Sequence, residues 1–291
     1  MLRDRLLYGA LLIALVVGLL WADEKLGAVR VGQVVLPPGL PMLALCLAAM
    51  APASVEFARM FERKGVSVCA PVLYGCGATG LLSVWLAPTL SQARGPELVA
   101  AAGAVAIAGA ALAHLRARKP EGFLGAIGAA SAAFIYLGLL AGFVLALRRD
   151  FSAWTVLAVI LITKACDSGA YFTGRSLGRH KLIAWLSPGK TWEGLVGGLA
   201  WGAGAAALFA NGEEFLPGLS IADAAVFGAG LGLCGQAGDL FASAIKRDSG
   251  LKDSSSILPG FGGVMDMIDS PLWVAPCAFW VLSICGNPAA P

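Results

Sequence analysis

Long apolar stretches alternate with short polar segments along nearly the whole chain. None alternates apolar and polar residues with the period of two expected of a transmembrane β-strand. A bilayer core needs about 20 residues of helix, and only helices satisfy the backbone of such apolar segments in lipid. The pattern therefore predicts an all-α polytopic membrane protein with about nine transmembrane helices, at about 6–22, 37–54, 65–87, 98–113, 122–147, 151–172, 194–210, 219–245 and 271–286.

The beginning of the chain shares two features with a secretory signal peptide, basic residues (Arg3 and Arg5) and an apolar run. No Ala-x-Ala cleavage site follows, and the run is long for a signal peptide, so we expect an uncleaved first membrane helix. Pro37, Pro38 and Pro41 open the second stretch. A helix tolerates proline there because the amides of its first turn have no partner within the helix.

Composition supports the membrane assignment. Only 13% of the 291 residues are charged and the mean hydropathy is +0.78, whereas soluble proteins carry about 25% charged residues. A soluble enzyme, a disordered chain and a secreted disulfide scaffold are therefore excluded. The seven cysteines are odd in number and form no Cys-x-x-Cys pair, so we expect them to be small packing residues.

The distribution of lysine and arginine predicts the orientation. With the N-terminus in the cytoplasm, fifteen of the 21 basic residues lie on the cytoplasmic side and Lys164 lies within a span. The two longest loops, 173–193 and 246–270, are then both cytoplasmic and basic. We divide the chain into N-terminal transmembrane helices (1–115) and a C-terminal catalytic transmembrane region (116–291) of one integrated membrane domain. The outside holds five basic residues: Lys25, Arg30, Arg94, Arg148 and Arg149. Arg148 and Arg149 are adjacent and form a local exception to the charge bias.

Charged residues inside the predicted spans are functional candidates, because an unpaired charge in lipid is costly. Helical spacing places Lys164, Asp167 and Tyr171 on one face, and Asp239, Ser243 and Lys246 on another. Asp266 and Asp269 lie one turn apart if their segment is helical. A structural ion pair at Lys164–Asp167 and a polar packing role for Asp239 are the alternatives.

Carboxylates that converge with lysines and arginines at a cytoplasmic membrane face suit a divalent metal and phosphate groups. The glycines of segment 259–263 would let the backbone approach an anion closely. The alternatives are a flexible turn for that segment and ordinary positive-inside residues, or contacts with anionic lipid, for loop 173–193.

Two other motifs do not withstand inspection. Segment 187–191 ends like a P-loop, but Ala184 stands where the first glycine is required and we expect no strand before it. The glycines between 228 and 235 resemble a dinucleotide fingerprint, but they lie in a predicted span, so helix packing is the better interpretation. A Ser/His/Asp triad is implausible because His114 and His180 are the only histidines.

The segment from Ser243 to Asp269 resembles the signature of the phosphatidate cytidylyltransferases (CDP-diacylglycerol synthases). That signature reads S-x-x-K-R-x4-K-D, then P-G-H-G-G, then D-R-x-D. The departures are Phe261, where the family has His, and Met267, where it has Arg. The matching residues are Ser243, Lys246, Arg247, Lys252, Asp253, Pro259, Gly260, Gly262, Gly263, Asp266 and Asp269.

Segments 167–175, 178–181, 187–194 and 238–241 also resemble this family, although Gly189 stands where the family usually has Lys. The resemblance covers about 120–291, whereas the first four spans match only as hydrophobic helices. It implies transfer of CMP from CTP to phosphatidic acid, with Mg²⁺ as cofactor and a second cation left open.

On this basis we predict roles for individual residues. Asp239 and Asp266 are the first choices as metal ligands, with Asp167 and Asp269 as further candidates. Glu193 orients a lysine or holds a metal-bound water, and Lys164 pairs with Asp167. Catalytic roles fall to Lys246, Arg247, Lys252, Asp239 and Asp266, and substrate-binding roles to Ser187, Lys190, Thr191, Tyr171, Asp253, Gly262 and Gly263.

The expected partners are CTP, phosphatidic acid and the lipid bilayer, with no nucleic acid and with a homodimer left open. The expected location is a bacterial inner membrane, with the active site facing the cytoplasm. Two other functions stay open at this point. A CTP-dependent polyprenol or lipid kinase would use a similar site, and a secondary transporter would place the charged residues on an ion pathway, although no internal symmetry suggests one.

Overall fold

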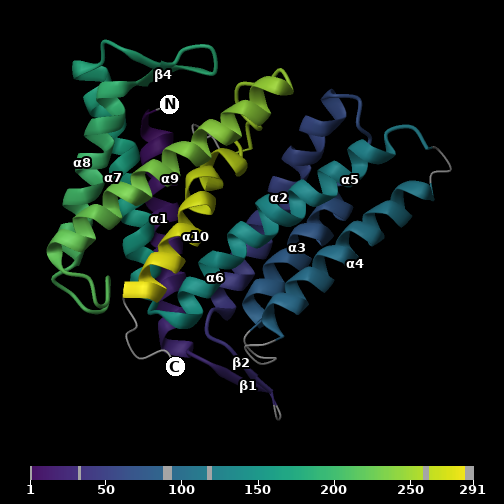
Figure 1. Ribbon diagram of the computed structural model, residues 1–291, viewed down its shortest axis with the longest axis horizontal. Coiled ribbons are helices and arrows are strands. Elements are labelled where there is room, and N and C mark those ends of the chain that lie inside the picture. Colours follow the sequence, from purple (N-terminus) through teal and green to yellow (C-terminus); the bar gives the residue numbers. More distant parts are fainter. Residues whose placement is uncertain (1, 32–33, 88–93, 117–119, 258–261, 286–291) are drawn as a thin grey trace. The chain divides into compact units, whose positions relative to one another are not determined.

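The structure, a computed structural model, describes residues 2–31, 34–87, 94–116, 120–257 and 262–285. Helices dominate it, and two short antiparallel hairpins, β1–β2 and β3–β4, complete it (Figure 1). The elements are α1 (Leu2–Leu26), β1 (Val29–Val31), β2 (Val34–Leu36), α2 (Leu40–Arg63), α3 (Ala70–Leu86), α4 (Gly95–Leu115), α5 (Phe123–Ala132), η2 (Ala133–Leu139), α6 (Leu140–Asp150), α7 (Ala153–Leu177), β3 (Lys181–Ile183), β4 (Ser187–Thr191), α8 (Trp192–Phe209), α9 (Ile221–Asp248) and α10 (Met265–Cys285).

Each predicted apolar stretch coincides with a helix, and α5, the π-helical segment η2 and α6 form one continuous helix. The mostly helical fold is thus confirmed, with the two hairpins as an addition to the all-α expectation. Nine crossings and a cytoplasmic N-terminus stay predictions. Among the described helices, six are long and apolar enough to cross a membrane: Leu40–Arg63, Gly95–Leu115, Phe123–Asp150, Ala153–Leu177, Ile221–Asp248 and Met265–Cys285.

Several helices extend beyond their apolar stretches. Helix α7 continues to Leu177, and α10 begins at Met265 rather than near 271. Both predicted cytoplasmic loops are therefore shorter than expected, and much of the first is the hairpin β3–β4. The apolar pattern could not detect these helix ends because they carry polar residues, such as Asp266 in the first turn of α10, where a carboxylate favours the helix N-terminus.

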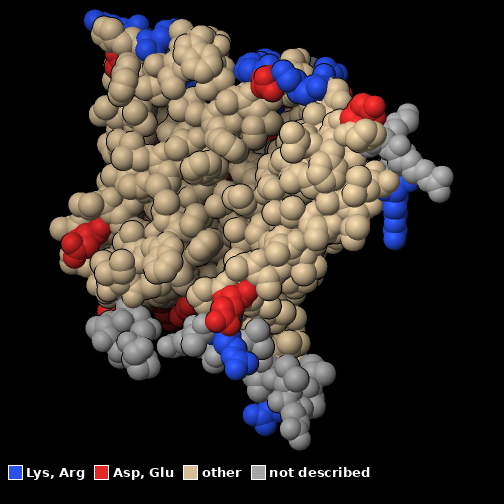
Figure 2. All heavy atoms as spheres, turned by 45° about the vertical axis from the view of Figure 1, so that its right-hand side comes forward, with Lys and Arg blue, Asp and Glu red and all other residues tan. Residues whose placement is uncertain are grey.

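The face shown in Figure 2 fits a membrane environment. Charged side chains are few on this face, and residues other than Lys, Arg, Asp and Glu make up most of it. Apolar side chains exposed on α4 and α8, such as Val105 and Leu208, have the character expected of lipid-facing residues.

The chain divides into two compact units. Unit 1 comprises Met1–Arg149 and Asp248–Met267. Within it, α3 packs against η2, α4 and α2. A Cβ atom on Gly80 would lie 2.6 Å from the carbonyl oxygen of Phe134, so glycine permits the close approach of α3 to η2. Small residues of α4, including Gly103 and Ala106, are buried, so this Ala/Gly-rich helix packs closely through one face.

Unit 2 comprises Asp150–Arg247 and Ile268–Pro291, and the contact between α7 and α8 is its most extensive. Glycines form the helix contacts here too. A Cβ atom on Gly228 would meet the backbone of Gly202 in α8, and one on Gly232 would lie 3.0 Å from Sγ of Cys166. These glycines therefore serve helix packing, as the sequence indicated, and not dinucleotide binding.

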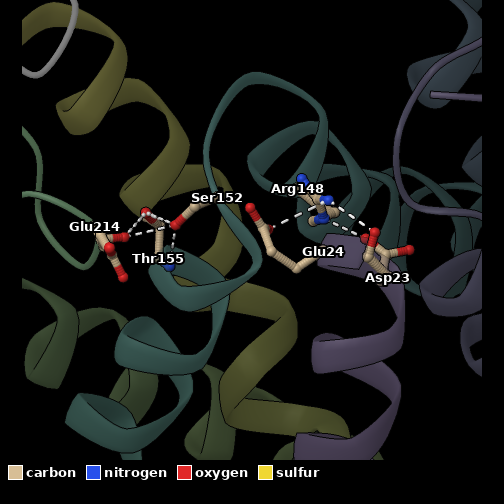
Figure 3. A network of polar contacts seen from close by, with 6 residues as sticks. All are labelled: Asp23, Glu24, Arg148, Ser152, Thr155 and Glu214. Carbon is tan, nitrogen blue, oxygen red and sulfur yellow. Dashed lines mark hydrogen bonds and ion pairs between the residues drawn. The ribbon is translucent and has the colours of Figure 1, made fainter. Parts of the chain in front are cut away.

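Ion pairing in unit 1 explains the local exception to the charge bias. Arg148 is 5% exposed and Asp23 is fully buried, and the Arg148 guanidinium donates to the Asp23 carboxylate (Figure 3). The guanidinium also lies 3.4 Å from a carboxylate oxygen of Glu24. Arg149 donates to the carbonyl oxygen of Val84 at 3.1 Å. Both arginines are thus bound within the fold and contribute little as free surface charge.

Cysteine proximity in unit 2 provides a direct test of helix packing. The Sγ atoms of Cys234 in α9 and Cys277 in α10 lie 3.1 Å apart as free thiols. Since a disulfide needs the sulfurs about 2.05 Å apart, a small oxidant should join these two residues after only a slight shift. Proteolysis and mass spectrometry of the oxidised protein should recover the α9 and α10 peptides cross-linked. Cys277→Ser is the control, and failure of the wild-type chain to cross-link would contradict this packing.

Candidate active site

An ion pair between Lys190 and Asp239 lies at the centre of the candidate site in unit 2. Lys190 Nζ lies 2.8 Å from Asp239 Oδ2, and the two side chains are 16% and 37% exposed. Lys190 belongs to β4, which leads directly into α8. Thr191 fixes that junction as the helix N-cap, since its Oγ1 accepts a hydrogen bond from the Gly194 amide at 3.1 Å. The structure therefore shows a capping role for Thr191, and its predicted contact with substrate stays a prediction.

Helices α9 and α10 cross closely beside Asp239. A Cβ atom on Gly238 would lie 2.8 Å from the carbonyl oxygen of Asp269, so glycine is required at this crossing. The crossing brings the charges of Asp239 and Asp269 close enough to repel each other, while Lys246 and Lys164 attract the charge of Asp269. Asp269 is 6% exposed. The structure thus gathers two carboxylates and three ammonium groups that the sequence singled out, Lys190 included.

The predicted face of α7 is only partly confirmed. Lys164 Nζ lies 3.1 Å from Asp167 Oδ2, with side chains 49% and 33% exposed, so the pair is not the buried ion pair considered as an alternative. The Tyr171 hydroxyl accepts a hydrogen bond from Arg175 at 2.9 Å. Tyr171 is largely exposed, so its predicted contact with substrate has no support beyond its position on this face.

The hairpin β3–β4 is fastened to both neighbouring helices of unit 2. The carboxylate of Glu193, in the first turn of α8, lies 2.6 Å from His180 Nδ1 and accepts hydrogen bonds from the amides of Arg179 and His180. Arg247 Nε, near the end of α9, donates to the carbonyl oxygen of Leu186 at 3.4 Å. Glu193 therefore anchors the hairpin that carries Lys190, rather than orienting a lysine directly.

Glu193 should make stability depend on pH below about 4.5. The hydrogen bond from His180 is the main cause that lowers the pKa of Glu193 from 4.5 to about 2. Because folding lowers this pKa, the stability that the carboxylate contributes is complete above pH 4.5 and is lost as the pH falls toward 2. The melting temperatures of wild type and Glu193→Gln should therefore differ most above pH 4.5 and converge near pH 2.

The matched control for this prediction is the same pair of proteins carrying His180→Ala. Removing the imidazole removes the main cause of the lowered pKa, so the difference in melting temperature should shrink throughout the pH range. A difference that stays the same from pH 6 to pH 3 in the wild-type background would contradict the assignment.

The signature segment in unit 1 is organised around Asp266. Its Oδ2 atom accepts three hydrogen bonds, from the Ser254 amide at 2.9 Å, the Ser254 hydroxyl at 2.8 Å and the Gly263 amide at 2.9 Å. Gly262 has φ of +93°, a left-handed conformation that favours glycine. Asp266 thus binds both Ser254 and Gly263, and the Gly263 amide that could have approached an anion donates to this carboxylate instead.

Glu56, in α2 of unit 1, is a contributor that the sequence did not reveal. Its carboxylate accepts hydrogen bonds from the Ser255 hydroxyl at 2.6 Å and from the amides of Val264 and Met265, both at 2.9 Å. It follows directly after the second apolar stretch, where a glutamate is expected at a solvated helix end. The sequence does not show that the Glu56 side chain is completely buried.

The other predicted site residues occupy varied positions. Lys252 and Asp253 are exposed next to Ser254 in unit 1, and Ser187 is half-buried at the start of β4 in unit 2. Pro259, Gly260 and Phe261 lie outside the described residues. The expectation that no strand precedes segment 187–191 is wrong, because β3 lies before it. The P-loop interpretation still fails, because the segment itself forms the strand β4 and Ala184 stands where the first glycine is required.

The carboxylates of unit 2 have suitable chemistry for a magnesium ion. Asp239 and Asp269 offer hard oxygen donors, which Mg²⁺ prefers, and the nearby lysines would suit phosphate oxygens bound to the same ion. Within the residues that the structure describes, no cluster of three or more His, Cys, Asp or Glu side chains could hold a metal alone. A cation here would therefore take additional ligands from substrate or water.

Comparison with known proteins gives consistent matches. The model of the cytidylyltransferase family matches residues 5–285. The chain is 41% identical to uncharacterized protein YnbB of Escherichia coli over 46% of its own length, and 42% identical to phosphatidate cytidylyltransferase of Haemophilus influenzae over 40%. It spans only 44% and 41% of those two proteins. Against phosphatidate cytidylyltransferase of Mycobacterium leprae it is 30% identical over 89% of this chain and 85% of that protein.

Proposed function

Because the chain belongs to the cytidylyltransferase family, we propose that it transfers CMP from CTP to phosphatidic acid, giving CDP-diacylglycerol and pyrophosphate for phospholipid synthesis. The observation that carries the proposal is the Lys190–Asp239 pair, with Asp269, Lys246 and Lys164 around it. Such a group offers cations for phosphates and carboxylates for a metal within one unit. The names of the relatives from Haemophilus and Mycobacterium support this substrate pair.

The chemistry requires positioning more than proton transfer. An oxygen of the lipid phosphate bonds to the α-phosphorus of CTP, and the bond from that phosphorus to the bridging oxygen of the β-phosphate breaks, so that pyrophosphate leaves with the electron pair. A phosphate monoester is already anionic at neutral pH and needs no strong base. Within unit 2, Lys190, Lys246 and Arg247 hold the phosphates and stabilise the charge on the leaving group. The role of Lys252, in unit 1, stays a prediction from the sequence.

Magnesium belongs to the proposal as cofactor. Within unit 2, Asp239 is the proposed first ligand, with Asp269 and Asp167 as further ones, and the metal when bound would polarise phosphate oxygens. The assignment of Asp266, in unit 1, as a ligand stays a prediction from the sequence. The hydrogen bonds to Oδ2 of Asp266 involve one oxygen of its carboxylate and set the orientation of the group. Gly238 supports the role of Asp239 by allowing α10 to pass closely beside it.

Nine crossings, a cytoplasmic N-terminus and a cytoplasmic active site in a bacterial inner membrane complete the proposal. Contacts within each unit support it, because segments assigned to the same side by the charge bias lie together. On the proposed cytoplasmic side these contacts are Lys64 with Asp248 (2.9 Å) and Arg247 with Leu186 (3.4 Å), and on the other side Arg148 with Asp23 and Ser152 with Glu214 (2.6 Å; Figure 3).

The decisive experiment is product analysis with the purified chain, CTP, Mg²⁺ and phosphatidic acid. Label at the α-phosphorus of CTP should appear in the lipid product, and label at the γ-phosphorus should appear in pyrophosphate. Transfer of the γ-label to a lipid acceptor would instead identify a CTP-dependent lipid kinase. Absence of both transfers, together with solute flux across liposomes, would favour a transporter.

A further inference from the structure

We infer that Glu56 is a positioning residue: within unit 1 it holds the turn at Gly262 and Gly263 and the start of α10, and with them Asp266, in the geometry that the reaction needs. The catalytic half of this inference rests on the proposed function. The structural half, that Glu56 fixes the turn, does not.

Burial and bonding of Glu56 are the first observation. Its side chain is fully buried, and its carboxylate accepts one hydroxyl and two amide hydrogen bonds, at 2.6, 2.9 and 2.9 Å. A carboxylate withdrawn from water is costly unless donors replace the lost hydration. All three donors belong to the segment around the glycine turn, Ser255 on one side and Val264 and Met265 on the other. The buried carboxylate and the turn therefore stabilise each other.

The second observation is that two carboxylates share three consecutive amide donors. The amides of Gly263, Val264 and Met265 are consecutive, and each donates to a carboxylate, the first to Asp266 and the other two to Glu56. These amides, with the first turn of α10, would otherwise form an anion-binding site. The protein's own carboxylates occupy that site. These amides are therefore committed to the fold, and the role of the turn is to place Asp266.

The third observation is that no side chain would fit at Gly263. A Cβ atom there would lie 2.5 Å from Oε2 of Glu56 and would collide with the Ser254 hydroxyl. The second glycine of the Gly262-Gly263 pair is thus explained by the close approach of Glu56, not by the approach of a substrate. This accounts for a signature glycine through a residue some two hundred positions earlier in the chain.

The test compares Glu56→Gln with Glu62→Gln, an exposed glutamate near the end of the same helix. Glutamine keeps the size of the side chain but replaces one acceptor oxygen with an NH₂ group, which cannot accept from the amides. We expect amide hydrogen exchange in peptides covering 251–268 to accelerate about tenfold or more in Glu56→Gln alone, a change that corresponds to loss of a buried hydrogen bond to a charged group. We also expect kcat to fall by about tenfold or more with little change in KM for CTP.

Several outcomes overturn the inference. If the amides of 251–268 in Glu56→Gln exchanged at the wild-type rate, Glu56 would not hold the turn, whatever the activity of the variant. A lower melting temperature with uniformly faster exchange and unchanged kcat would reduce Glu56 to a general stabilising residue. If Glu56→Gln fails to fold, Ser255→Ala removes one of the three hydrogen bonds and should give a smaller increase in exchange of the same segment. If wild type transfers no CMP, the proposed function fails while the exchange result still decides the structural half.

Discussion

Asp239→Asn is expected to reduce CMP transfer by about a hundredfold or more, the usual cost of removing a group that stabilises charge in a phosphoryl transition state. The substitution keeps the shape of the side chain but removes the negative charge that faces Lys190 at 2.8 Å. Both proposed uses of Asp239, as a metal ligand and as the partner that orients Lys190, require that charge. The measurement is the initial rate of α-label transfer from CTP over a Mg²⁺ titration.

A matched control for this variant lies on the same helix. Asp223 near the start of α9 accepts a hydrogen bond from the Ser220 hydroxyl at 2.6 Å and serves the helix end. Asp223→Asn should therefore leave the rate within about twofold of wild type, since weakening an exposed contact with the cap residue Ser220 affects stability rather than catalysis. Near-normal activity of Asp239→Asn at limiting Mg²⁺ would disprove the metal assignment.

Arg148→Ala is expected to lower the free energy of unfolding by about 3–5 kcal/mol, the cost of leaving one partner of a buried ion pair uncompensated. The reason is that Asp23 is fully buried and Arg148 is 5% exposed, so neither charge can regain full hydration when the other is removed. Equilibrium unfolding in mixed detergent micelles, or the melting temperature in one detergent, measures the loss.

Lys25→Ala, which removes an exposed basic residue close to Asp23, is the control and should change stability by less than about 0.5 kcal/mol. The double variant Asp23→Leu with Arg148→Leu should recover much of the lost stability, because it removes both buried charges together. A loss in Arg148→Ala no larger than that in Lys25→Ala would mean that the pair is solvated in the membrane-embedded protein.

The sequence was sufficient for the helices and for much of the candidate site in unit 2. Apolar stretches locate helices reliably because lipid leaves the backbone no alternative. The separation of Lys164 from Asp167 predicted their contact because helical geometry fixes such neighbours. The proximity of Asp239 to Lys190 followed only from family resemblance, since nothing local connects a strand residue to a helix residue that far along the chain.

What the sequence could not reveal depends on burial and on bonding between distant segments. Glu56 reads as an ordinary polar residue after an apolar stretch, and only its burial and three donors distinguish it. The cap formed by Thr191 was not predicted, because a hydroxyl has the same chemistry whether it caps a helix or binds a phosphate. Asp266 was predicted as a metal ligand from its type, while its bonds to Ser254 and Gly263 emerge only in the fold.

The Lys190–Asp239 pair also has a thermodynamic consequence. In the absence of substrate each charge neutralises the other, so a phosphate that binds the ammonium of Lys190 competes with Asp239 for its charge. A carboxylate held less strongly by Lys190 becomes a better ligand for a cation. Under the proposed function, nucleotide and metal must therefore each raise the affinity of the other, and by the same factor, because linkage between two binding equilibria is reciprocal. The resting ion pair would thus couple the loading of the two ligands.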